Sequence, residues 1–456
     1  MKKVQSCSLN SNSTRYWSLL RKLSGKRSKQ PPNQPITFGN KILSKSFSIA
    51  KKFNKQFSSV GTHKQNPETR RVIRNLKHKH QVDPSFTPFT DVLTLEAINH
   101  SSNSTATGPD GLTSLHLKHL GPKGISYLTN LFNLSLQHAN LPSIWKTAHI
   151  IPVPKPGKPP NLSTSYRPIS LLSPAVKILE RLLLPFINPP TVPLSSSQHG
   201  FRPFRSTTSA LLPLITAAAN GFNQKKPPTR TGIVCLDISK AFDSVDHTLL
   251  LKQLSGSDIN SNVVRWLAVY LRGRKAKCLF RSSISPPLII HSGVPQGSVL
   301  SPSLFNIFVS DFPSLALLHV SFADDFYIGE SAPDLPSLTA ALNRDLALVE
   351  AWADAKKLSI APSKSSVLLL TPDPHQSKTH LQVYYKGDLI PMDKNPKCLG
   401  NTINTHLNST PHGNDLYPRL SKRLQIMKAL GGTPFGQCME TLLTTYKCLM
   451  RPLMDF

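Results

Sequence analysis

The spacing of apolar residues predicts helices along much of the chain. In residues 124–139 and 337–357 the apolar positions recur every three or four residues, so they fall on one face of a helix. Thr90 is a suitable N-cap for a helix that begins at Asp91. The same periodicity predicts helices at residues 16–23, 49–57, 171–184, 249–254, 263–271, 305–309, 420–430 and 439–449.

Short apolar runs predict strands between these helices. Residues 232–238 form a β-branched run with an acid near its end, which indicates a buried strand. Residues 317–322 and 326–328 flank the pair Asp324-Asp325 and indicate a hairpin. Further strands are expected at residues 148–151, 278–280, 288–291, 367–370, 383–385 and 398–399. Helices and strands do not alternate regularly, which favours an α+β fold over a doubly wound sheet.

Composition narrows the class of protein. The chain has 456 residues, enough for one large domain or about three smaller units. Its hydrophobic fraction of 39% fits a globular protein, and its 40 prolines argue against a helical bundle. The six cysteines form no Cys-x-x-Cys pair, which excludes a disulfide scaffold and a zinc ribbon and fits a reducing compartment. No apolar run approaches the length of a membrane span, and no signal peptide is visible.

Positive charge is concentrated near the N-terminus. The chain has a formal charge of +30, and residues 1–80 hold nineteen Lys or Arg residues against a single acid, Glu68. A polyanion relieves such self-repulsion, and nucleic acid is the commonest one. A solvated basic tail and an anionic membrane surface are the alternatives, although no amphipathic basic helix is obvious here.

Three acidic residues stand out because the chain has few acidic residues in total. Asp237 ends an apolar strand, and Asp324 and Asp325 lie between two others. Carboxylates beside buried strands are costly unless they are paired or bind a metal, and Mg²⁺ prefers such hard oxygen ligands. A pair of Mg²⁺ ions held in this way can catalyse phosphoryl transfer. The plain alternatives are that Asp324-Asp325 is only a turn and that Asp237 caps the short segment 239–242.

Three strings of residues carry a resemblance to a known family. Residues 235–247 read Cys-Leu-Asp-Ile-Ser-Lys-Ala-Phe-Asp-Ser-Val-Asp-His, residues 293–302 read Gly-Val-Pro-Gln-Gly-Ser-Val-Leu-Ser-Pro, and residues 322–325 read Phe-Ala-Asp-Asp. In this order, within about ninety residues, they resemble the core motifs of reverse transcriptases. The chain is most similar to the polymerases of non-LTR (LINE-type, jockey-like) retrotransposons.

The resemblance extends over roughly residues 85–456. It includes residues 106–112, 145–180, 198–208, 397–400 and 419–456. It implies a right-hand polymerase with fingers and palm, an incomplete helical thumb and a basic N-terminal arm. The implied division is a partly disordered arm (1–84), an N-terminal extension with fingers (85–232), a palm (233–400) and a partial thumb (401–456).

The resemblance also implies a metal site. Asp237, Asp324 and Asp325 would hold two Mg²⁺ ions, with Mn²⁺ as an alternative, and the backbone carbonyl of Ile238 would add a ligand. Asp325 is expected to be more structural than ligating. Phe242 lies five residues after Asp237, where the family places the ring that excludes a ribose 2′-hydroxyl. The alternative for Phe242 is an ordinary core ring.

Other roles follow from the same resemblance. Lys155 or Lys158, with Arg167, would clamp the triphosphate, although the two lysines could also be merely solvated. Lys364 would protonate the pyrophosphate leaving group, or it is a plain exposed lysine. Two further groups of residues are implied: template and base-pair contacts at Gln296 and Gly297, and a primer grip at Cys398, Leu399 and Gly400.

The implied function is RNA-directed DNA synthesis from dNTPs on a primer, as in retrotransposition. The expected partners are an RNA template, in particular the RNA of the element itself, and a DNA primer, with no membrane partner. The function implies the nucleus after cytoplasmic synthesis, although the sequence has no clear targeting signal. Because the resemblance stops inside the thumb at Phe456, the alternative is a truncated, inactive remnant that binds nucleic acid.

Overall fold

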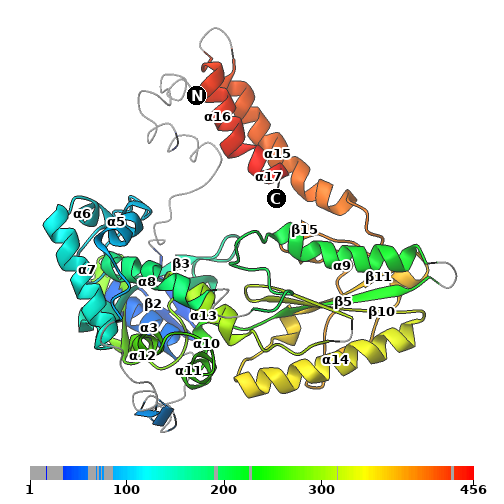
Figure 1. The fold of residues 1–456 in the computed structure, drawn as a ribbon. Helices are drawn as coiled ribbons and strands as arrows, with labels where there is room; N and C mark the ends of the chain where they lie inside the picture. The colour runs from blue at the N-terminus through cyan, green and yellow to red at the C-terminus, as the bar shows by residue number, and fades with distance from the viewer. Residues whose placement is uncertain are drawn as a thin grey trace.

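The fold is known from a computed structural model. It describes Trp17, Glu68 and residues 34–59, 71–72, 74–75, 86–188, 194–224, 228–315, 317–432 and 436–455. Helices and antiparallel strands are mixed within these residues, as the sequence predicted (Figure 1). Among the described residues no helix is long and apolar enough to cross a membrane.

A four-stranded antiparallel sheet forms the centre of one half of the molecule. Its strands are, in spatial order, β11 (Ser366–Leu370), β5 (Arg230–Asp237), β10 (Asp325–Ala332) and β9 (Leu318–Phe322). One face packs against α9 (Thr207–Phe222) and the other against α14 (Leu335–Lys356), as Figure 1 shows. The sheet is therefore buried on both faces, which explains why β5 is a continuous apolar run rather than an alternating one.

A second sheet lies beside the first. Its strands are β4 (Tyr166–Leu171), β3 (Thr147–Pro154), β6 (Arg274–Phe280), β7 (Ser283–Ile284) and β8 (Leu288–Ile290). β3 runs parallel to β6, and the other pairs are antiparallel. The sheet is covered by α3 (Ser46–Ser58), which follows the hairpin of β1 (Ile36–Phe38) and β2 (Lys41–Leu43). Phe53 of α3 packs against Tyr166 and Phe280, so part of the basic N-terminal segment belongs to the folded core.

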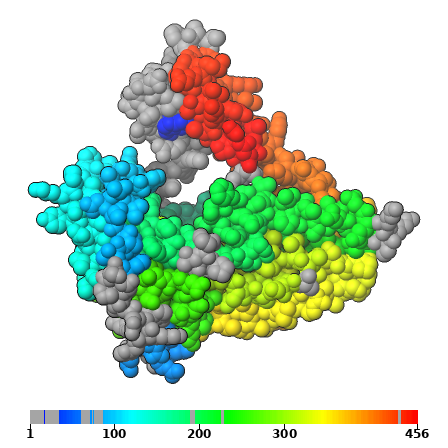
Figure 2. All heavy atoms as spheres, viewed as in Figure 1, coloured from blue at the N-terminus to red at the C-terminus, as the bar shows by residue number. Residues whose placement is uncertain are grey.

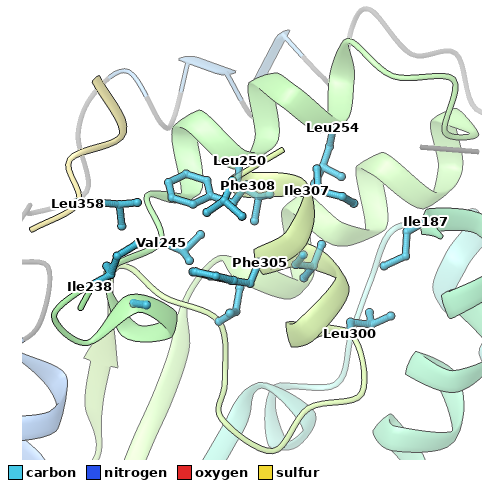
Figure 3. Packing of buried hydrophobic residues seen from close by; sticks show 14 of the residues in the cluster. Ile187, Ile238, Val245, Leu250, Leu254, Leu300, Phe305, Ile307, Phe308 and Leu358 are labelled. Atoms are coloured by element: carbon cyan, nitrogen blue, oxygen red, sulfur yellow. The ribbon is translucent and has the colours of Figure 1, made fainter. Parts of the chain in front are cut away.

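Helices surround the junction of the two sheets. They are α5 (Asp91–Asn99), α6 (Ser114–Lys118), α7 (Pro122–Gln137), α8 (Pro174–Ile187), α10 (Ala241–Ser244), α11 (His247–Ser255), α12 (Ser261–Leu271) and α13 (Ser301–Phe308). Figure 3 shows Phe305 and Phe308 of α13 packed among Val245, Leu250 and Leu358. This cluster lies directly behind the end of β5, so it supports the strand end that carries Asp237.

The C-terminal helices stand away from the sheets. They are α15 (Thr410–Leu430), α16 (Met439–Leu449) and α17 (Arg451–Met454). Two short hairpins precede them. One is formed by β12 (Tyr384–Tyr385) and β13 (Asp388–Leu389), and the other by β14 (Lys397–Cys398) and β15 (Asn401–Thr402). Figure 2 shows a hollow between the red C-terminal helices and the cyan helices, with the green surface of α9 below it.

Most of the predicted elements are present. The helix at 439–449, the hairpin around Asp324-Asp325 and the helix capped by Thr90 all form, and the Thr90 hydroxyl accepts a hydrogen bond from the Leu93 amide. The segment 171–184 differs at its start, because Leu171 ends β4 and the helix begins at Pro174. The island predicted at 16–23 lies outside the described residues except for Trp17, which is helical.

The spacing of apolar residues did not reveal α9. Its sequence contains an internal proline, Pro213, and its buried positions are mainly alanine and leucine. Its start does carry a recognisable signal, because Ser206 and Ser209 form a reciprocal capping box.

Glu330 in β10 and Asp345 in α14 form a buried acidic pair. Their side chains are 7% and 1% exposed, and the Arg344 guanidinium lies 3.6 Å from Glu330 and 3.5 Å from Asp345. Burial, and then the neighbouring Asp345 carboxyl, raises the pKa of Glu330 to about 7 from its usual 4.5. The folded state therefore holds a proton that the unfolded state releases, and stability falls as the pH rises from about 4.5 to about 7.

We predict that Glu330→Gln stabilises the protein above pH 7, because the amide mimics the protonated carboxyl. A gain on the order of 1–2 kcal/mol is expected after allowing for screening by Arg344 and solvent, and it should disappear near pH 5. Thermal denaturation between pH 5 and pH 8.5 measures this. Glu96→Gln, on the exposed face of α5, is the matched control; an equal gain there, or a gain that does not change with pH, contradicts the assignment.

Candidate active site

Three carboxylates meet at one end of the central sheet. Asp237 is the last residue of β5 and Asp325 the first of β10, and the two are direct partners in the antiparallel register. Asp324 lies beside them in the two-residue turn between β9 and β10, where Ala323 has a φ of +59°. Residues far apart in the sequence are thus brought together by strand pairing alone.

The electrostatics of this cluster is unfavourable without a cation. Burial, and then Asp324 and Asp237, raises the pKa of Asp325 to about 6. Burial and Asp237 also raise the pKa of Asp324, while the Arg167 guanidinium opposes that rise. Within the described residues no group of three or more His, Cys, Asp or Glu side chains is arranged so that it could hold a metal ion by itself. The donor set still fits Mg²⁺, which takes one or two carboxylates and completes its shell with water and phosphate oxygens.

Cationic side chains lie near these acids. Lys155 and Lys364 interact with Asp237 and Arg167 interacts with Asp324, while Lys158 is a neighbour of Lys155. Lys155 is held by a hydrogen bond from its amide to the Ser165 carbonyl (2.7 Å) and from its ammonium to the Thr164 carbonyl (3.0 Å). Burial lowers the pKa of Lys155, and the nearby charges of Lys364, Arg167 and Lys158 lower it further. The structure therefore gathers all four predicted cations in one region.

Lys364 lies next to Asp237. Its Nζ atom is 3.9 Å from Asp237 Oδ1, and the two side chains are 62% and 44% exposed, so the pair contributes little to stability. The backbone explains the position: the Ala361 amide donates to the Asp237 carbonyl (3.0 Å), and Ile238 pairs with Ile360. The 3₁₀ turn that carries Lys364 is thereby tied to the end of β5.

A cavity beside two of the acids extends to Lys397, which directly precedes the predicted primer-binding residues. The cavity has a volume of about 530 Å³ and is lined by Asp237, Asp325, Lys364 and Lys397 among others. β14 and β15 form a hairpin whose turn residues, Leu399 and Gly400, both have positive φ (+47° and +95°). Cys398 is buried, and its sulfur lies 3.6 Å from that of Cys235 in β5, so the hairpin is anchored to the central sheet.

The segment 293–301 packs against the second sheet. The Gln296 carbonyl accepts a hydrogen bond from the Ser170 amide (2.8 Å), and Gly297 has a φ of +119°. Phe242 lies near this segment, stacked on Phe305 with ring centroids 4.7 Å apart. Phe242, Gln296 and Gly297, the residues predicted to contact the nucleotide and the template base, therefore lie in two segments that touch each other.

A buried carboxylate that sequence reasoning missed holds this segment. Glu180 of α8 is fully buried and accepts hydrogen bonds from the Val299 amide (2.7 Å) and the Tyr270 hydroxyl (2.6 Å). The Tyr270 hydroxyl in turn lies 3.0 Å from Ser298 Oγ. Burial raises the pKa of Glu180, and the hydrogen bonds oppose that rise. The available signal was the single acid of the mostly apolar segment that became α8.

A second missed residue, Gly200, supports the turn that carries Asp324. The His199 amide donates to the Ser321 carbonyl (2.8 Å), and the Gly200 carbonyl accepts from the Asn306 side chain (2.9 Å). A Cβ atom on Gly200 would lie 2.2 Å from the Ala323 amide nitrogen. Only glycine allows this close approach, and the string 198–202 that was matched to the family contains it.

Comparison with protein families identifies the chain. Residues 153–403, more than half of its length, match the model described as reverse transcriptase (RNA-dependent DNA polymerase). The chain belongs to the reverse transcriptase family. The match includes all three carboxylates and the predicted cations, and the mixed helix and sheet fold is consistent with such a polymerase domain.

Three curated relatives of the chain come from fly transposons. It is 30% identical over 74% of its length to the probable RNA-directed DNA polymerase from transposon BS of Drosophila melanogaster, of which 38% is covered. It is 28% identical, over 82% of its length, to the probable RNA-directed DNA polymerase from transposon X-element of the same species, of which 41% is covered. It is 28% identical, over 84% of its length, to the RNA-directed DNA polymerase from mobile element jockey of Drosophila funebris, of which 42% is covered. The chain thus spans about two fifths of these relatives, and the predicted jockey-like family is confirmed.

We predict that Gly200→Ala destabilises this reverse transcriptase and displaces Asp324. The added Cβ would overlap the backbone of the turn, and such overpacking typically costs about 1–3 kcal/mol. Chemical denaturation measures the loss. Gly121→Ala is the control, because no atom lies within 4 Å of the Cβ built there. Equal effects of the two substitutions contradict the proposed role of Gly200.

Proposed function

We propose that this chain is an RNA-directed DNA polymerase that adds deoxynucleotides to a primer. The observation that carries the proposal is the meeting of Asp237 and Asp325 through strand pairing, with Asp324 beside them, opposite Lys155 and Arg167. Acids on one side and cations on the other suit a triphosphate that binds between them with divalent ions. The relatives' names describe the same activity.

The acids would hold the ions. Asp237 and Asp324 would present carboxylate oxygens to the ions, Asp325 would play a more structural part, and the Ile238 carbonyl would add a further oxygen. Two Mg²⁺ ions held there, or Mn²⁺ in their place, would stabilise the negative charge on the attacking 3′ oxygen and on the leaving pyrophosphate.

The cations would bind the triphosphate. Arg167 is suited to bidentate contact with phosphate oxygens, and Lys155 and Lys158 act as point charges. The Lys155 ammonium donates a hydrogen bond to the Thr164 carbonyl, which already fixes its direction. Lys364, which lines the cavity beside Asp237, would donate a proton to the leaving pyrophosphate.

Other residues would select the correct nucleotide and hold the primer. Phe242 stacks on Phe305 and so presents a fixed ring, which suits exclusion of a ribose 2′-hydroxyl. Gln296 and Gly297 would contact the template base and the incoming base pair. Cys398, Leu399 and Gly400, which follow the cavity residue Lys397, would hold the primer end.

We assign the larger units on the same basis. The central sheet with α9 and α14 is the palm, the second sheet with its helices is the fingers, and α15 and α16 are part of the thumb. The chain crosses between these units more often than boundaries at residues 84, 232 and 400 imply, because α9 precedes residue 232, β6–β8 follow it and α3 precedes residue 84. The basic segment before residue 84 would contact the RNA template or the primer, since it carries more than half of the net positive charge. The nucleus is the proposed site of action.

Primer extension tests the proposal. We expect the chain to extend a DNA primer on an RNA template with dNTPs and Mg²⁺, and Asp324→Ala/Asp325→Ala to abolish extension. Asp388→Ala, which removes an exposed acid from β13, should leave extension unchanged. Salt-dependent RNA binding without extension by the unaltered chain contradicts the proposal and favours a binding protein without polymerase activity.

Metal binding can be measured without activity. We predict that Mg²⁺ raises the free energy of unfolding, by about 1.4 kcal/mol at a free concentration tenfold above its Kd. Asp324→Asn should remove this effect and should stabilise the metal-free protein, because like charges no longer meet at the sheet end. Thermal denaturation with Mg²⁺, against NaCl of matched ionic strength, is the measurement. An unchanged Mg²⁺ response in Asp324→Asn contradicts the placement of the ions.

A further inference from the structure

Asp243 is a nearly buried acid with no part in the chemistry described above. It follows Phe242 in α10, and both of its carboxylate oxygens lie 3.1 Å from the side-chain nitrogen of Gln296. It therefore connects the ring proposed to check the sugar with the amide proposed to contact the base pair.

The backbone strengthens this connection. The Ser292 hydroxyl donates to the Asp243 carbonyl (3.1 Å), and the Val294 amide donates to the Phe242 carbonyl (2.8 Å). A Cβ atom on Gly293 would lie 2.7 Å from Asp243 Cα, so the two segments touch where only glycine fits. Movement of α10 and movement of the segment 292–296 are thus linked.

The charge of Asp243 decides how Gln296 is oriented. An ionised carboxylate only accepts hydrogen bonds, so the Gln296 side chain must turn its NH₂ group toward it and its carbonyl oxygen away. A neutral amide in place of Asp243 would allow either orientation. Burial raises the pKa of Asp243 to about 6, which leaves the carboxylate ionised at pH 8.

Phe242 depends on the same helix. Its ring is stacked on Phe305 (4.7 Å) and meets the edge of Phe201 (6.2 Å), so its place follows from the position of α10 between these rings. A shift of α10 moves the surface that a ribose 2′-hydroxyl would meet.

We propose that Asp243 is a positioning residue for nucleotide selection, which orients the Gln296 amide and keeps Phe242 in register with it. The proposal rests on the polymerase function proposed above. It assigns to Asp243 no contact with the nucleotide itself.

The test compares deoxy- and ribonucleotide use by Asp243→Asn, Gln296→Ala and the double variant. The full chain extends a primer on an RNA template, and kcat and KM are measured for a dNTP and the matching rNTP. We expect Asp243→Asn to lower the dNTP preference about tenfold, the value of one lost hydrogen bond to a charged group, mainly through a higher KM for the dNTP. In the Gln296→Ala background, Asp243→Asn should not lower the dNTP preference any further.

Asp246→Asn is the matched control. It makes the same chemical change three residues away, in a carboxylate that caps α11 and pairs with Lys357 (2.8 Å). Asp243→Asn is nearly isosteric, and thermal denaturation checks that it folds. Two results overturn the inference. One is an Asp243→Asn variant that keeps the dNTP preference of the unaltered chain. The other is a double variant whose loss of preference equals the sum of the losses in Asp243→Asn and Gln296→Ala.

A second readout separates this inference from the proposed function. Binding of labelled dNTP, with rNTP as competitor, is measured on a complex with a chain-terminated primer. If the unaltered chain binds dNTP selectively but does not extend, the binding preference of Asp243→Asn still decides the inference. An unaltered chain that neither extends a primer nor binds dNTP overturns the proposed function, and the inference with it.

Discussion

The repulsion between carboxylates at the end of the central sheet is the constraint on which this structure depends. Asp237 and Asp325 are adjacent because β5 and β10 pair in one register, and a slip by one residue would turn each side chain to the opposite face. That register is specified by apolar side chains buried on both faces, against α9 and α14. Hydrophobic packing thus offsets an electrostatic cost at the site where a polymerase needs negative charge.

Buried polar groups position the remaining wall of the site. The segment 293–301 is irregular, and its shape depends on Glu180 from α8, on Asp243 from α10 and on the Ser170 amide of β4. A buried acceptor of this kind is costly to leave without donors, so each one specifies the backbone around it. Elements from three parts of the chain therefore converge on one loop.

Individual elements show what pattern alone could predict. The helix at 439–449 was found at its observed bounds because its apolar face is regular. β5 was expected at 232–238 and observed at 230–237, and its apolar run with β-branched residues revealed it. α9 was not found, since an alanine-rich helix with an internal proline has little periodic contrast. Glu180 and Gly200 lay within strings matched to the family, yet their roles depend on partners more than a hundred residues away, Val299 and Ala323.

The sequence by itself determined the family, the mixed helix and sheet class and the identity of the charged groups, because motifs and local periodicity are properties of neighbouring residues. Only the tertiary structure decided which of those groups meet. Strand register brought Asp237 to Asp325, and packing of the 3₁₀ turn brought Lys364 within 3.9 Å of Asp237. The tertiary structure also brought Gln296 into hydrogen-bond contact with Asp243, because a hydrogen bond between distant residues depends on how the whole chain folds.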